Sequence, residues 1–242
     1  MIQFPKLTDT IKHLVIINLI MFIGPKITNL DLSNFFNLHF PKNELFQFWQ
    51  YFTSIFMHGS FGHLFFNMIG LWMFGSSVEY LLGSKRFLFL YFSAGIGAAL
   101  IHTAVHYFQF NPIYEIFVNA GLTDTEIIDI LNAQQTSDPR LAGAITQLQF
   151  TKIVTIFNTS ALGASGAIFG IFAASAVYFP NHKILIFPIP FPLPNKLIMI
   201  SLIISDLVLG IFSLPGDNVG RFAHVGGAIV GFIITFYWKK IK

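Results

Sequence analysis

A serine stands between glycines in the stretch Gly163-Ala164-Ser165-Gly166, inside the apolar run 156–179. A serine hydroxyl becomes a nucleophile when a base takes its proton, and the oxyanion that then forms on the attacked carbonyl needs hydrogen-bond donors. Two other apolar runs supply candidates, because one opens with His63 and Asn67 and another opens with His224. We interpret these side chains as one serine-hydrolase site assembled inside a membrane.

Each piece of this site also has a purely structural interpretation. Small residues recur where membrane helices pack closely. A histidine or an asparagine at the mouth of a helix can simply bond a buried carbonyl group. Polar side chains within a bilayer are nevertheless costly and point to function by default, and close packing would bring the serine within reach of the histidine. The glycines that suit both interpretations are Gly163, Gly166, Gly227 and Gly231.

The composition is that of an integral membrane protein. Of 242 residues, 54% are hydrophobic and only 10% are charged, with 30 Phe and a mean hydropathy of +0.67. Soluble domains carry about 25% charged residues. The chain has no cysteine, which excludes disulfides and thiol chemistry, and its net charge is only +3. No basic run indicates nucleic-acid binding, and no phosphate-binding loop motif is present.

The apolar runs predict an all-α membrane domain over residues 1–242 with six transmembrane helices. Residues 29–60 mix aromatic with polar side chains and suit the membrane interface. The segment 109–155 holds five of the eleven acidic residues and is expected to be an extended polar loop. Thr123 and Glu126 match a capping box, which predicts one short amphipathic helix there. The expected spans are 8–28, 62–82, 87–107, 156–179, 196–214 and 222–238.

The distribution of Lys and Arg predicts the orientation. With six spans, nine of the 14 basic residues lie on the side of the two termini and five on the other side. This excess places both termini in the cytoplasm. The second, fourth and sixth spans then run inward from the outer face, so that His63, Asn67, Ser165 and His224 lie at a similar depth.

These motifs, taken in order along the chain, resemble those of the rhomboid intramembrane serine proteases. The resemblance covers about residues 49–238. In that family the first loop often has Trp-Arg, whereas this chain has Trp49-Gln50, which puts the anchoring of the loop in question. The matching motifs are Trp49-Gln-Tyr-Phe-Thr, His58, His63-x-x-x-Asn67, Gly75-x-x-x-Glu79, Gly163-Ala-Ser165-Gly166 and Ala223-His224-x-x-Gly227-x-x-x-Gly231.

The resemblance implies a Ser-His dyad without a third, acidic member. Ser165 would be the nucleophile and His224 the base, and the backbone N–H of Ser165 with the side chains of His63 and Asn67 would bind the oxyanion. Phe169 would lie under the His224 ring. The family further implies single-span transmembrane substrates within the lipid bilayer, no metal and no cofactor. Its gate and cap would correspond to residues 197–214 and 214–220.

Several other classes of membrane protein remain to be weighed. A zinc protease would need H-E-x-x-H, which is absent, and an aspartyl protease would need a partner for Asp206, a residue without an assigned role. His102 and His106 form an i, i+4 pair with no evident third metal ligand. A transporter would want more mid-membrane charge or broken helices. The main alternative is a catalytically inactive rhomboid-like protein that binds transmembrane clients, and the oligomeric state is left open.

Overall fold

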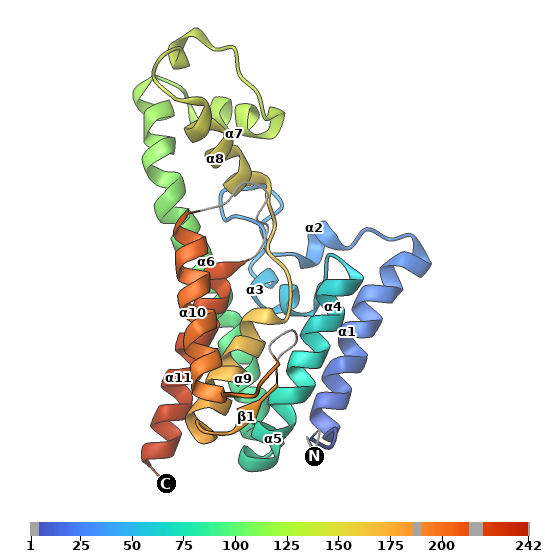
Figure 1. Ribbon diagram of the computed structural model, residues 1–242. Coiled ribbons are helices and arrows are strands. Elements are labelled where there is room, and N and C mark those ends of the chain that lie inside the picture. Colours follow the sequence, from blue (N-terminus) through green and yellow to red (C-terminus); the bar gives the residue numbers. More distant parts are fainter. Residues whose placement is uncertain (1–4, 186–189, 213–219, 242) are drawn as a thin grey trace.

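The computed structural model describes residues 5–185, 190–212 and 220–241, and it is built from helices in two parts (Figure 1). A bundle of long helices forms one part and carries both described ends of the chain at the same end of the molecule. A smaller group of helices stands on the opposite end. The described chain is thus all-helical apart from one short hairpin, as the composition predicts.

The bundle contains the apolar helices. Within the described residues, α1, α6, α10 and α11 are long and apolar enough to cross a membrane, whereas α9 is apolar but has only 14 residues. Helices α4 and α5 join through the single π-helical turn η2 into one continuous run. The bounds are α1 Asp9–Thr28, α4 Phe61–Gly70, η2 Leu71–Gly75, α5 Ser76–Leu82, α6 Ser84–Asn119, α9 Ser165–Tyr178, α10 Asn195–Phe212 and α11 Arg221–Lys240.

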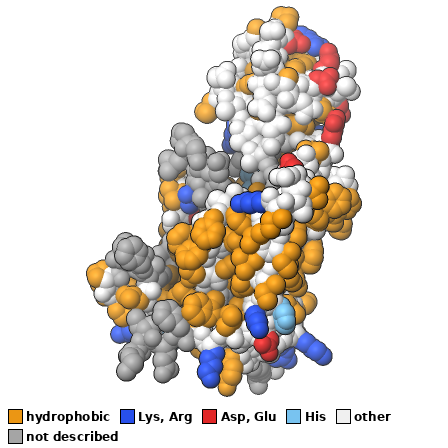
Figure 2. Space-filling model, turned by 90° about the vertical axis from the view of Figure 1, so that its right-hand side faces the viewer, with side chains coloured by type: hydrophobic (Ala, Val, Ile, Leu, Met, Phe, Trp, Pro, Cys, Tyr) orange, Lys and Arg blue, Asp and Glu red, His pale blue; other side chains and the backbone are white. Residues whose placement is uncertain are grey.

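The surface of the bundle is apolar where a membrane would surround it. Figure 2 shows hydrophobic side chains over the middle of the molecule, with Lys and Arg near its lower end and Asp and Glu gathered on the smaller part. Ile20, Ile211 and Phe236, for example, are each more than half exposed. In water such a surface would be unfavourable, so the chain is a multi-pass protein embedded in a membrane.

The loop before α4 is anchored by Gln50, which stands where the resemblance suggested an arginine. This loop contains α2 (Ser33–Phe36), α3 (Gln50–Thr53) and η1 (Ser54–Phe56). The Gln50 side chain is completely buried, and its Oε1 accepts hydrogen bonds from two backbone N–H groups at 3.1 Å. Its Nε2 donates to two backbone carbonyls at 2.9 and 3.1 Å. A neutral amide therefore holds the loop without an arginine.

Helix α6 is longer than the sequence predicted, and it carries the smaller part of the molecule. We expected the third span to end at 107, but the helix runs through Pro112 to Asn119. The reason is packing, since its last turns form a second apolar core with α7 (Asp124–Ala133) and α8 (Gln147–Asn158). The capping box at Thr123 is confirmed. The prediction of only one short helix in 109–155 was wrong, because a second capping box at Thr146 starts another helix, α8.

The apolar run 156–179 is not one continuous helix. The fourth span was expected to begin at 156, but α8 ends at Asn158, and the chain then runs without helix down into the bundle until α9 begins at Ser165 (Figure 1). The proline-rich connector after α9 contains the hairpin of β1 (Lys183–Ile184) and β2 (Leu193–Pro194). Residues 186–189 of this connector and most of the expected cap at 214–220 lie outside the described residues.

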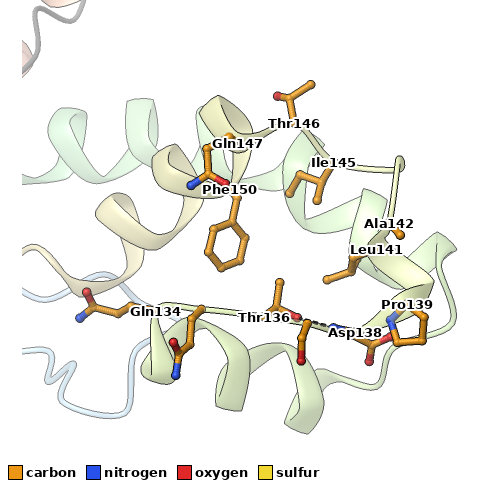
Figure 3. Close-up of a pocket in the computed structure, with 12 residues that line it drawn as sticks. Gln134, Thr136, Asp138, Pro139, Leu141, Ala142, Ile145, Thr146, Gln147 and Phe150 are labelled. Atoms are coloured by element: carbon orange, nitrogen blue, oxygen red, sulfur yellow. Dashed lines mark hydrogen bonds between the residues drawn. The ribbon is translucent and has the colours of Figure 1, made fainter.

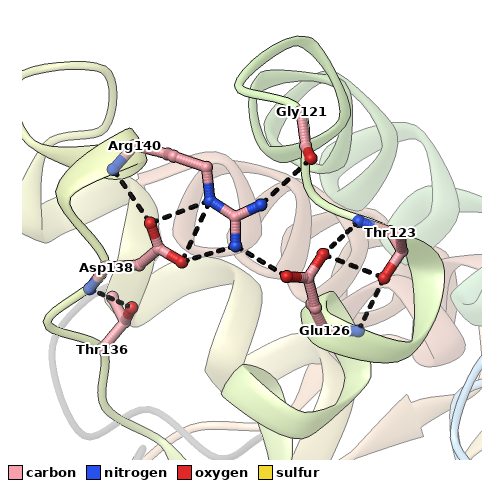
Figure 4. Close-up of polar contacts among 6 residues, drawn as sticks. All are labelled: Gly121, Thr123, Glu126, Thr136, Asp138 and Arg140. Carbon is pink, nitrogen blue, oxygen red and sulfur yellow. Dashed lines mark hydrogen bonds and ion pairs between the residues drawn. The ribbon is translucent and has the colours of Figure 1, made fainter.

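Ion pairs tie the loops of the smaller part together. Arg140, in the short helix η3 (Pro139–Leu141), binds Asp138 and Glu126, each at 2.7 Å, and donates to the carbonyl of Gly121 (Figure 4). The Arg140 guanidinium lowers the pKa of Glu126 to about 2, with help from the bonds to Thr123. The carboxylate therefore stays charged at neutral pH. All these groups are at the surface, so the network orders the loops more than it stabilises the fold.

Candidate active site

Helices α9 and α11 touch through their backbones. A Cβ atom added to Gly227 would collide with the carbonyl oxygen of Gly166, and one added to Gly231 would collide with the carbonyl oxygen of Gly170. Gly170 in turn meets the Cβ of Ala94 on α6. Small residues allow such close approach of membrane helices. The packing interpretation of these glycines and the chemical one thus describe the same contact.

This contact brings a serine and a histidine together. Ser165 is the first residue of α9 and His224 lies in the first turn of α11. The Nε2 atom of His224 is 2.9 Å from the Oγ atom of Ser165, although the residues are 59 positions apart in the sequence. Ser165 is only partly buried. The distance is that of a hydrogen bond between a nucleophile and its base.

The imidazole of His224 is held on one face by Phe169, one turn after Ser165 on α9. The two ring centroids are 4.3 Å apart and the ring planes differ by only 6°. Such stacking fixes the plane of the imidazole while leaving both nitrogens free to form hydrogen bonds. Phe169 thus supports the ring, in the place that the sequence suggested for it.

The other nitrogen of His224 meets a residue that the sequence analysis could not place. Asp206 on α10 has its Oδ2 atom 2.9 Å from Nδ1 of His224, and its Oδ1 atom 3.0 Å from Nη1 of Arg221. Asp206 is buried, so both contacts are shielded from water. An acidic residue within an apolar run needs a polar partner, but no pattern in the sequence pairs Asp206 with α11.

His63 and Asn67 lie beside the loop that leads into Ser165. A Cβ atom on Gly163 would lie 2.7 Å from the His63 ring and 3.8 Å from Nδ2 of Asn67. Gly163 has φ of +123°, a conformation that side chains rarely adopt, and its N–H bonds the carbonyl of Ser54 at 2.9 Å. Glycine here serves two needs, the backbone turn and the room for the imidazole. The structure therefore gathers the predicted residues around the start of α9.

Comparison with known proteins identifies the family. A protein-family model described as "Rhomboid domain" matches residues 45–114 and 139–241. The chain belongs to the rhomboid family. It is 31% identical over 227 residues to "Rhomboid protease AarA" of Providencia stuartii, covering 90% of this chain and 61% of that protein. The gap in the match, residues 115–138, lies in the smaller part at the end of α6.

Two further rhomboid relatives are more distant. "Rhomboid protein 1, mitochondrial" of Saccharomyces cerevisiae is 26% identical over 188 residues, which is 77% of this chain and 41% of that protein. "Putative rhomboid protease YdcA" of Bacillus subtilis is 26% identical over 214 residues, covering 88% and 76%. The matched part of the chain thus spans 61% of the length of the Providencia stuartii protein and 41% of the length of the Saccharomyces cerevisiae protein.

In this rhomboid chain, His58 holds the Asn67 side chain. Nε2 of His58 is 2.9 Å from Nδ2 of Asn67, while Nδ1 of His58 is 3.3 Å from the carbonyl oxygen of Phe56. A carbonyl only accepts hydrogen bonds, so Nδ1 carries the proton and Nε2 accepts from the amide of Asn67. The second amide hydrogen of Asn67 is left for another acceptor. His58 was recognised in the sequence only as part of a motif.

His102 and His106 on α6 lie beside each other, with their ring centroids 4.0 Å apart. Among the residues that the structure describes, no group of three or more His, Asp or Glu side chains is arranged to hold a metal ion.

A hollow of about 400 Å³ lies in the smaller part of the molecule (Figure 3). It is lined mainly by polar side chains of the segment 134–147 together with Phe150, and no lysine, arginine or histidine is among the described residues that line it.

Proposed function

We propose that the protein is an intramembrane serine endopeptidase that cleaves transmembrane proteins. The observation that carries the proposal is the 2.9 Å contact between Ser165 Oγ and His224 Nε2 at the junction of two membrane-embedded helices. Membership of the rhomboid family and the protease names of relatives agree with it. Neither metal nor cofactor is needed for this chemistry.

In the proposed mechanism, His224 takes the Ser165 proton as Oγ attacks the scissile carbonyl. His224 then gives that proton to the leaving amine, and water hydrolyses the acyl-enzyme by the same steps. The oxyanion is bound by the backbone N–H of Ser165 and by the side chains of His63 and Asn67. The backbone N–H of Ser165, at the start of α9, has no acceptor within the helix, and the positive end of the helix dipole favours negative charge there.

We further propose six membrane crossings with both termini in the cytoplasm. The continuous run α4–η2–α5 and the short α9 would be the crossings beyond the four long apolar helices. The excess of Lys and Arg at the end that carries both termini supports this orientation. The cleaved bond then lies in or near the outer end of a single-span substrate, which must unwind locally because a helix keeps its carbonyls hydrogen-bonded.

A catalytically inactive rhomboid that binds transmembrane clients is the second candidate. The proposal of an enzyme is favoured because a client-binding protein has no need of an aligned serine and histidine. Purified protein in detergent should react with a fluorophosphonate probe, which labels only an activated serine. Labelling is expected to vanish in Ser165→Ala and in His224→Ala. A folded wild-type protein that neither takes the probe nor cleaves peptides in liposomes would favour client binding.

The oxyanion assignment predicts a loss of turnover without a loss of fold. Asn67→Ala is expected to lower kcat about 10²–10³-fold, because one donor to the oxyanion is removed. His58→Ala is expected to give a smaller loss, since it only frees the Asn67 side chain from its partner. Asn158→Ala in α8 is the control, because the amide of that asparagine donates to backbone carbonyls of the smaller part, away from the site. Unchanged kcat in Asn67→Ala would show that Asn67 is structural.

A further inference from the structure

We propose that Asp206 is a third member of the active site, a positioning residue that accepts the Nδ1–H of His224 and so fixes the tautomer that serves Ser165. The proposal rests on the function proposed above and departs from the Ser-His dyad that the family resemblance implies. It assigns a role to the one acidic residue in the middle of α10.

The geometry uses both oxygen atoms of the carboxylate. Oδ2 is 2.9 Å from Nδ1 of His224, and Oδ1 is 3.0 Å from Nη1 of Arg221. The side chains of Asp206, His224 and Arg221 are only 9%, 13% and 17% exposed. Burying a carboxylate is unfavourable unless it is paired and hydrogen-bonded. Asp206 has two such partners, Arg221 and the proposed catalytic base His224.

The chemistry of the groups sets the position of the proton. A carboxylate can only accept, so the hydrogen between Asp206 and His224 belongs to Nδ1. A neutral imidazole carries one proton, which leaves the lone pair on Nε2 directed at Ser165 Oγ. With Phe169 stacked on its face, the ring is fixed in plane, in rotation and in tautomer.

The proton balance needs no further reactant. When Oγ of Ser165 bonds to the substrate carbonyl, its proton moves to Nε2 and His224 becomes an imidazolium. Asp206 stabilises this charge and keeps its own charge throughout. When the C–N bond breaks, the Nε2 proton leaves with the amine and the neutral ring is restored.

The contact also ties the site to α10, which was expected to be the gate. Few residues of this helix are buried, and they are Asn195, Ile198, Met199, Asp206 and Gly210. Much of the rest faces outward, such as Ile204 and Ile211. A movement of α10 away from α11 would separate the carboxylate from Nδ1. The catalytic base is therefore correctly set only while α10 lies against α11.

Asp206→Asn tests the proposal because the amide has a preferred orientation. Arg221 only donates hydrogen bonds, so the amide oxygen should face Arg221 and the NH₂ group should face Nδ1 of His224. Nδ1 must then accept, and the ring proton moves to Nε2, where it blocks transfer from Ser165. Peptide cleavage is expected to lose kcat by about 10²–10⁴-fold with KM within a factor of about three, while the protein stays folded.

A spectroscopic readout separates positioning from mere tethering of the helices. In ¹⁵N-histidine-labelled protein, the His224 signals, assigned with His224→Ala, should report Nδ1–H in the wild type and Nε2–H in Asp206→Asn. Arg221→Gln is the matched control, since it removes the other ion pair of Asp206 and should keep both the Nδ1–H tautomer and kcat within about tenfold. Equal losses of kcat in Asp206→Asn and Arg221→Gln with one unchanged tautomer would overturn the proposal.

The outcome also distinguishes this inference from the proposed function. If the wild type is labelled by fluorophosphonate and Asp206→Asn cleaves with the wild-type kcat, only the role of Asp206 is refuted, and the pair of Ser165 and His224 suffices. If the wild type is neither labelled nor active, both the proposed protease and its third member are refuted.

Discussion

Ser165→Ala, His224→Ala and the double variant are expected to lose cleavage to the same residual level, on the order of 10⁵–10⁶-fold below the wild type. The serine is useless without the base that takes its proton, and the base has no proton to take without the serine. In the proposed mechanism they act as one unit through their 2.9 Å contact, so the effects of the two substitutions should not add. Single-turnover cleavage of a transmembrane peptide in liposomes measures all three variants.

The matched control for these variants is Ser175→Ala. Ser175 lies on the same helix α9 and bonds Nδ2 of Asn195 at 2.9 Å, far along the helix from the site. This variant should keep kcat and lose only stability. If the losses in Ser165→Ala and His224→Ala multiplied in the double variant, the two residues would act independently and the proposed chemistry would be wrong.

Most residues of the candidate site could be predicted from the sequence, because they lie in short local motifs. Glycines beside Ser165 and His224 signal close packing, and that packing forces the two side chains together. The membrane class, the helical fold and the capping box at Thr123 followed equally from composition and spacing. These features depend on residues that are near one another in sequence, or on one kind of contact that small residues make possible.

The remaining features depend on packing between distant segments. Nothing local to Asp206 indicates that α10 would turn it toward α11, because a buried acid in an apolar run fits many partners. The extension of α6 to Asn119 was missed because polar residues mask a helix that packs on α7 and α8. Likewise, residues 159–164 lie within the apolar run 156–179 but are not helical. Hydropathy alone could therefore not place the start of α9 at Ser165.

Gly227→Ala is expected to slow cleavage by about 10²-fold although it adds only one methyl group. The new Cβ would collide with the carbonyl oxygen of Gly166, the residue next to Ser165. Helices α9 and α11 must then move apart or slide, and displacement of a catalytic group by about 1 Å can cost about 10²-fold in rate. Overpacking of this kind typically costs 1–3 kcal/mol of stability as well. Cleavage rate and thermal unfolding in detergent check both effects.

Two other glycines separate the causes of that loss. Gly24→Ala on α1 is the control for adding a methyl group, because nothing lies within 4 Å of the new Cβ, and it should leave activity and stability nearly unchanged. Gly231→Ala would collide with the carbonyl of Gly170, one turn farther from the serine. It should destabilise the protein about as much as Gly227→Ala but reduce kcat less. Full activity in Gly227→Ala would mean that the contact of α9 with α11 does not set the distance between Ser165 and His224.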